Sequence, residues 1–76
     1  MTPKEIALDQ VASGGRVRIV RIEAGHSLKN RLTAMGFLVD EPIKVVRNDN
    51  HGQVIIAVKN SKVVLGRGMS HKIFVQ

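Results

Sequence analysis

The side chains best suited to binding a transition metal are three histidines, because the chain contains no cysteine. They are His26, His51 and His71. No two of them have the i, i+4 spacing of one helix face or the i, i+2 spacing of one strand face. We therefore interpret them as exposed loop residues and predict no metal site. A surface site in which Asp49 joins His51 stays open as the alternative.

The hydroxyl and carboxylate side chains form no recognisable catalytic pattern. The serines fall in predicted turns or helix caps, and none has the flanking glycines of a nucleophile elbow. The six acidic residues lie mainly in turns, where aspartate typically hydrogen-bonds the nearby backbone. No Gly-Lys-Ser/Thr follows Gly14-Gly15 or Gly66-Arg67-Gly68, so neither segment is predicted to bind phosphate. The sequence thus predicts neither an enzyme nor a cofactor.

The chain is strongly basic, with a formal net charge of +6. This charge favours an acidic partner, such as nucleic acid, anionic lipid or an acidic protein surface. The basic residues are dispersed, however, as expected for outward positions of short strands. Phe37 and Phe74 are the only aromatic residues, so the stacking surface of a single-strand nucleic-acid binder is missing. We therefore expect no nucleic acid partner.

The length of 76 residues predicts one domain, residues 1–76. No apolar run approaches the roughly 20 residues of a membrane span, and the N-terminus lacks the apolar stretch of a signal peptide. The absence of cysteine fits a reducing compartment. We therefore expect a cytoplasmic protein without membrane insertion.

One well-defined helix is predicted over residues 27–35. Ser27 is a candidate N-cap, and Gly36 stands where the chain leaves the helix in a left-handed conformation. Three residues spaced i, i+4 and i+7 form one apolar face, which should plug the core: Leu28, Leu32 and Met35. Two earlier helical turns are predicted, at residues 2–5 as a capping box and at residues 8–12 with Asp9 as cap.

The rest of the chain is predicted to be β-structure. Five short strands are expected, at residues 16–23, 43–47, 53–59, 62–65 and 71–75. Apolar residues occupy both faces of the first strand, which indicates either two covered faces or a β-bulge. Residues 48–52 read as a hairpin loop, residues 60–61 as a tight turn and residues 66–70 as a turn region. This spacing on so short a chain predicts a small closed barrel with one helix.

The sequence motif at the end of the predicted helix resembles that of a known family. Residues 31–37 read Arg-Leu-Thr-Ala-Met-Gly-Phe, Ile43-Lys44-Val45 opens the next strand, and Lys72-Ile73-Phe74-Val75 closes the chain. With these motifs the chain resembles the FeoA family, small cytosolic SH3-like barrels of bacterial ferrous iron uptake. The resemblance runs from Leu8 to Val75.

Two positions depart from the family pattern. Val39-Asp40 stands where the family usually has Pro-Gly, and aspartate adopts a left-handed conformation less readily than glycine. The family's small alanine before the final strand is replaced near Met69-Ser70. Both changes touch surface that could set the choice of partner.

The resemblance implies a non-enzymatic accessory that engages the cytosolic portion of FeoB, a membrane iron transporter with a G-protein domain. The same module also ends DtxR-type metal-dependent repressors, but these 76 residues include no predicted DNA-binding domain, so we expect a stand-alone accessory. Two alternatives stay open: a basic nucleic-acid-binding barrel, and an iron chaperone that uses the histidines. Weak self-association through an exposed sheet edge is a further open point.

The partner surface is predicted at the helix end and the connector that follows it. The connector is more apolar than a solvated turn needs, and exposed apolar clusters beside a basic residue often mark interaction sites. The alternative is that Phe37 and Leu38 simply cap the open end of the barrel. The predicted docking residues are Arg31, Met35, Phe37, Leu38 and Val39.

Overall fold

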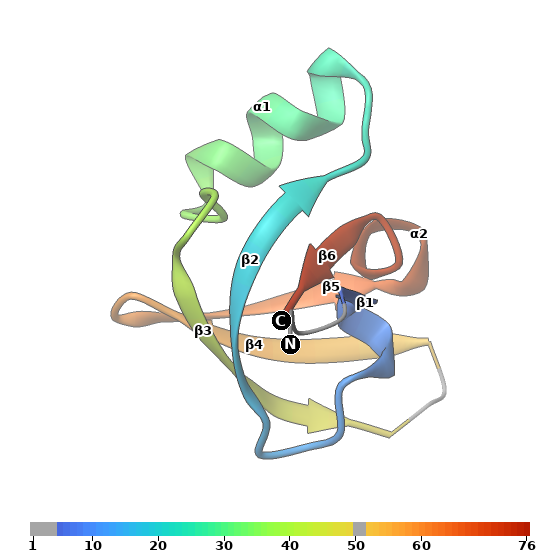
Figure 1. Ribbon diagram of the computed structural model, residues 1–76, viewed down its shortest axis with the longest axis vertical. Coiled ribbons are helices and arrows are strands. Elements are labelled where there is room, and N and C mark those ends of the chain that lie inside the picture. The colour runs from blue at the N-terminus through green and yellow to red at the C-terminus, as the bar shows by residue number, and fades with distance from the viewer. Residues whose placement is uncertain (1–4, 50–51) are drawn as a thin grey trace.

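The computed structural model describes residues 5–49 and 52–76. These residues form a six-stranded antiparallel sheet with the strand order β1-β6-β2-β3-β4-β5 (Figure 1). The strands are β1 (Ile6–Ala7), β2 (Arg16–Ile22), β3 (Pro42–Asn48), β4 (Gln53–Val58), β5 (Ser61–Gly66) and β6 (Ile73–Val75). The helices are η1 (Leu8–Gln10, a 3₁₀ turn), α1 (His26–Ala34) and α2 (Arg67–Ser70). The predicted mainly-β fold with one longer helix is confirmed.

The sheet is open, so the predicted closure into a barrel is wrong. All five predicted strands are present, and β1 is an additional strand of two residues that pairs with β6. Among the described residues, β1 and β5 end the strand order and do not pair with each other. A two-residue strand offers too few backbone groups to bridge that gap. The sheet instead curves around the core, with β2 running along much of the molecule in Figure 1.

A β-bulge in β2 resolves the ambiguity of its apolar pattern. The first part of β2 pairs with β3, and the part from Ile19 onward pairs with β6. The register shifts between Ile19 and Arg21, so that Ile19 is fully buried and Ile22 also packs against the core. The bulge interpretation is therefore confirmed, and it is what bends this strand between two partners.

The core is aliphatic except for one phenylalanine. Alternate residues of the strands point into it, and Leu32 of α1 is fully buried there. Leu28 and Met35 are half-buried against it, which confirms the predicted apolar helix face. The buried apolar residues are Leu8, Val11, Ile19, Leu32, Phe37, Ile43, Val45, Val54, Ile56, Val58, Leu65, Ile73 and Val75.

The predicted helix caps need correction. The helix α1 begins at His26 with Gly25 as N-cap, so Ser27 already lies inside the helix. The extended backbone of Gly25, at φ −66° and ψ 168°, defines the cap. In η1 the N-cap is Ala7, and Asp9 is therefore inside the turn and not its cap. The capping box at residues 2–5 lies outside the described residues except for Glu5, which is not helical.

Two turns also differ slightly from the prediction. The β4–β5 hairpin turns at Lys59 and Asn60, because Ser61 already pairs with Val58 across the two strands. Lys59 takes the left-handed conformation there, with φ +55°. The turn region at residues 66–70 is the short helix α2.

Candidate interaction site at the end of helix α1

A Schellman motif ends α1. The N–H of Gly36 donates to the carbonyl oxygen of Thr33 at 3.0 Å, and the N–H of Phe37 donates to that of Leu32 at 3.0 Å. Gly36 has φ +99°, the left-handed conformation that this motif requires. The predicted role of Gly36 is confirmed. Because these two bonds tie Gly36 and Phe37 to the last turn of the helix, the direction of the following connector is fixed.

Phe37 lies in the core, so it cannot be a docking residue in the folded protein. Its side chain is 0% exposed, as is that of Leu32. Two apolar residues at these positions of a Schellman motif commonly pack on each other. We therefore correct the predicted docking surface by removing Phe37. For this residue the alternative of capping the core is the better interpretation.

Leu38 and Val39 are displayed on the surface by the connector. Their exposed fractions are 40% and 57%. Of the large apolar residues that the structure describes, only Ile6 and Val64 are comparably exposed, and they belong to β1 and β5. We define the connector patch as Leu38 and Val39 together with Arg31, which is exposed, and Met35, which is half-buried. It keeps four of the five predicted docking residues.

The connector is held to β2 by backbone hydrogen bonds. Asp40 donates its N–H to the carbonyl oxygen of Ile19 at 2.7 Å, and Ile19 donates to that of Glu41 at 3.1 Å. The N–H of Glu41 donates to the carbonyl oxygen of Leu38 at 3.0 Å, closing a turn around Val39. Asp40 has φ +71°, so the aspartate takes the left-handed conformation at a position where the sequence pattern favours glycine. The patch therefore sits on a fixed backbone.

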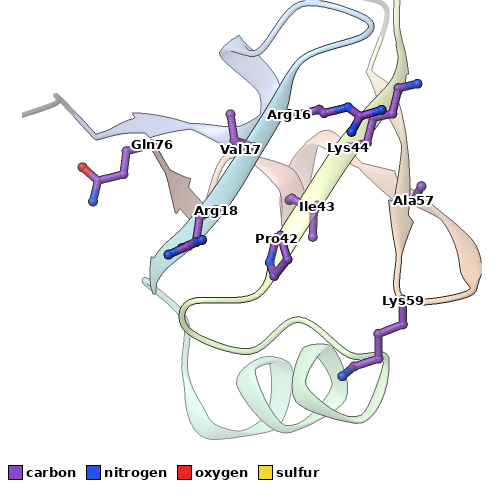
Figure 2. A pocket seen from close by; sticks show the side chains of 9 residues that line it. All are labelled: Arg16, Val17, Arg18, Pro42, Ile43, Lys44, Ala57, Lys59 and Gln76. Carbon is purple, nitrogen blue, oxygen red and sulfur yellow. The ribbon is translucent and has the colours of Figure 1, made fainter.

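A shallow basic groove, which no sequence pattern predicted, crosses β2 and β3 and reaches β4 (Figure 2). Its volume is about 760 Å³. We call it the cationic groove, because four of its nine lining residues are basic and none is acidic. These basic residues are Arg16, Arg18, Lys44 and Lys59. Arg16 and Arg18 alternate on β2, whereas strand pairing brings Lys44 and Lys59 to them from distant positions in the sequence.

The histidines, which the sequence analysis interpreted as exposed loop residues and not as metal ligands, are not brought together in the described part of the chain. His26 begins α1, and His71 is the C-cap of α2, where its Nδ1 hydrogen-bonds the carbonyl oxygen of Arg67. His51 lies outside the described residues. Residues 5–49 and 52–76 contain no group of three His, Cys, Asp or Glu side chains placed to hold a metal ion. The same residues contain no helix with the length and hydropathy of a membrane span.

The second aromatic residue is covered by a cation. The guanidinium carbon of Arg21 lies 4.2 Å from the centre of the Phe74 ring. Arg21 is held there by ion pairs to Glu23 and to Glu5, the latter with a distance of 2.8 Å between Arg21 Nε and Glu5 Oε1. One face of Phe74 is therefore occupied by the protein itself.

Comparison with known proteins gives a consistent family. A family model described as the FeoA domain matches residues 6–76. A Methanocaldococcus jannaschii protein, whose name assigns it provisionally as Fe(2+) transport protein A, is 41% identical over 63 residues. That alignment covers 83% of this chain and 76% of the relative.

Solved structures with the same fold include iron-transport proteins and a repressor. A crystal structure of the iron uptake regulatory protein FeoA superposes with a TM-score of 0.89 at 25% identity, covering 96% of this chain and 97% of that one. The iron(II) transport protein A of Clostridium thermocellum gives 0.85 at 25% identity, with 93% and 44% covered. A manganese-dependent transcriptional repressor gives 0.88 at 22% identity, over 99% of this chain and 42% of the repressor. This last likeness concerns the fold alone.

Proposed function

The chain belongs to the FeoA family, and from this premise we propose that it is a non-enzymatic cytoplasmic accessory of ferrous iron uptake. It acts by direct contact with the cytosolic G-protein portion of the membrane transporter FeoB. The assignment to iron uptake is supported by the relative named for Fe(2+) transport, at 41% identity over 83% of this chain. The connector patch is the surface that makes the contact.

The observation that carries this proposal is the exposure of Leu38 and Val39 next to each other on a fixed backbone. Leaving two neighbouring apolar side chains in water is unfavourable by about 25 cal/mol for each Å² that a partner could cover. Such a pair is therefore a natural centre for an interface, with Arg31 as a polar neighbour at its rim.

The fixed backbone of the connector makes binding more favourable. Association has a free-energy cost when loops must be ordered at the interface. Here the hydrogen bonds of Asp40 and Ile19 already order the connector, and the Schellman motif at Gly36 orders its beginning. Little conformational entropy remains to be lost when a partner covers Leu38.

Calorimetric titration of the purified cytosolic portion of FeoB into this protein tests the proposal. We expect saturable binding whose affinity changes little between about 50 mM and about 200 mM salt, because the contact is centred on apolar side chains. Binding that falls by orders of magnitude over this range would point to a purely electrostatic contact instead. The absence of saturable binding at both salt concentrations would overturn the proposal.

A further inference from the structure

We propose that the cationic groove binds an extended acidic peptide segment through Arg16, Arg18 and Lys44. This surface differs from the connector patch, and the inference does not rest on the proposed function. It starts from the like charges that the strand pairing places side by side.

Arg16 and Lys44 are directly opposite each other in the β2–β3 pairing. Opposite residues in an antiparallel pair share one face of the sheet, and like charges in this relation destabilise it. Both side chains are exposed, and neither makes an ion pair or side-chain hydrogen bond within residues 5–49 and 52–76. An anion placed between them would turn a repulsive pair into two attractive contacts.

Arg18 extends the same cationic face along β2. It lies two residues after Arg16, so both side chains leave the same side of the strand, roughly 6.7 Å apart. Pro42 is opposite Arg18, and Ala57 is opposite Lys44, so these less bulky apolar residues lie beside the cations. The groove therefore presents two arginines at alternate positions of β2, with Lys44 beside the first of them.

Lys59 closes one end of the groove. Its Nζ lies 3.4 Å from Glu41 Oε1, and in Figure 2 its side chain points toward α1. Among the ion pairs within residues 5–49 and 52–76, this one alone brings a carboxylate to a cation of the groove. The remaining three cations are left for a ligand.

The spacing of these cations fits an extended peptide. Alternate side chains of an extended chain are also roughly 6.7 Å apart on one face, so aspartates or glutamates at alternate positions match Arg16 and Arg18. Each guanidinium can hold a carboxylate through two hydrogen bonds. The backbone of Arg18 is already paired in both directions with Gln76, at 2.9 and 3.0 Å. The peptide is therefore recognised by side chains across the sheet face and does not add as a new strand.

A peptide is favoured over single-stranded nucleic acid by the residues of the groove. Base stacking on aromatic rings supplies much of the affinity of such nucleic-acid sites. None of the nine residues that line the groove is aromatic. Of the two aromatics, Phe37 is buried and Phe74 carries Arg21 on one face. The groove offers charge at a regular spacing without a surface for bases.

The test uses a fluorescently labelled peptide of alternating aspartate and alanine, titrated by anisotropy. We expect saturable binding to the wild-type protein and a loss of about tenfold or more in affinity for the Arg16→Ala/Lys44→Ala double variant. The matched control is Lys29→Ala/Arg67→Ala, which also removes one lysine and one arginine, from exposed positions of α1 and α2 that do not line the groove. It should bind like wild type. Removing the repulsive pair should leave the thermal midpoint of the Arg16→Ala/Lys44→Ala variant unchanged or higher. A loss of peptide affinity is then not explained by unfolding.

Three results would overturn the proposal. The first is equal weakening by both double variants, which would indicate only general attraction to a basic protein. The second is tighter binding of an oligothymidylate with the same net charge as the peptide, which would indicate a nucleic-acid site. The third is an absence of saturable peptide binding. None of these results bears on the titration with FeoB, so the two proposals fail separately.

Discussion

The backbone N–H of Phe37 donates to the carbonyl oxygen of Leu32 at 3.0 Å, and the side chains of both residues are fully buried in one core. The helix end is therefore fixed twice, by a backbone bond and by packing. Because the connector starts at this point, the same two residues determine where Leu38 and Val39 emerge. The stability of the fold and the position of the connector patch are thus linked.

Leu32→Ala should destabilise the protein by about 2–5 kcal/mol, the range for a buried leucine that leaves a cavity. The control is Leu38→Ala, a leucine that is 40% exposed, which should change the free energy of unfolding by much less. Chemical denaturation of the three proteins measures both values. Equal effects of the two substitutions would show that α1 does not plug the core.

Gly36→Ala should destabilise by about 1–2 kcal/mol, because an L-residue at φ +99° is strained. The added Cβ would have ordinary contacts of 3.5 Å with Lys59 and Val58, so the effect comes from the backbone and not from a clash. Gly68→Ala is the control, since Gly68 is helical and has open space around it. It should be neutral or stabilising in the same denaturation experiment. A Gly36→Ala protein as stable as wild type would argue against the left-handed helix end.

Asp40 offers a complementary test, because it takes φ +71° without being a glycine. Asp40→Gly should stabilise by about 0.5–1 kcal/mol by removing this strain. Asp40→Ala should destabilise, because alanine keeps the strain and loses any local hydrogen bond of the carboxylate. The expected order of thermal midpoints is glycine, aspartate, alanine. Any order that places alanine above glycine would contradict the left-handed connector.

Ser70→Ala should leave stability unchanged or raise it by about 1 kcal/mol. The Ser70 side chain is 0% exposed, and its Oγ has no hydrogen-bond partner among the described residues. A buried hydroxyl without a partner costs about 1–3 kcal/mol in desolvation, and alanine removes that cost. Ser13→Ala is a useful contrast, because Ser13 Oγ accepts from the N–H of Asn48 at 2.8 Å. Marked destabilisation by Ser70→Ala would show that the hydroxyl has a partner after all.

The features that the sequence predicted well depend on local chemistry. The stop at Gly36 follows from the conformational freedom of glycine, and the burial of Leu32 follows from helical periodicity. The N-cap was misplaced because Gly25, without a side chain, provides the cap through its backbone, whereas Ser27 has the more typical cap side chain.

The features that the sequence missed depend on distant pairing. The open sheet follows from the shortness of β1, which no local pattern specifies. The cationic groove arises because the β2–β3 register places Arg16 opposite Lys44, two residues far apart in the chain. Phe37 is buried while the next residue, Leu38, is exposed, and this difference depends on the path of the connector after the Schellman motif. Such relationships are set by tertiary structure and not by neighbouring residues.

Leu38→Glu is the most direct test of whether the connector patch binds FeoB. The cytosolic portion of FeoB would be titrated calorimetrically into wild type, Leu38→Glu and Val64→Glu, with the thermal midpoint of each variant recorded. Val64→Glu is the matched control, because Val64 is 56% exposed on β5, outside the patch. Val39→Glu, at a residue 57% exposed, serves as a second patch variant if Leu38→Glu is unstable.

We predict that Leu38→Glu stays folded and loses about tenfold or more in affinity, as expected for a charge buried in an interface, while Val64→Glu binds like wild type. A folded Leu38→Glu or Val39→Glu protein that binds the FeoB portion as tightly as wild type would contradict the claim.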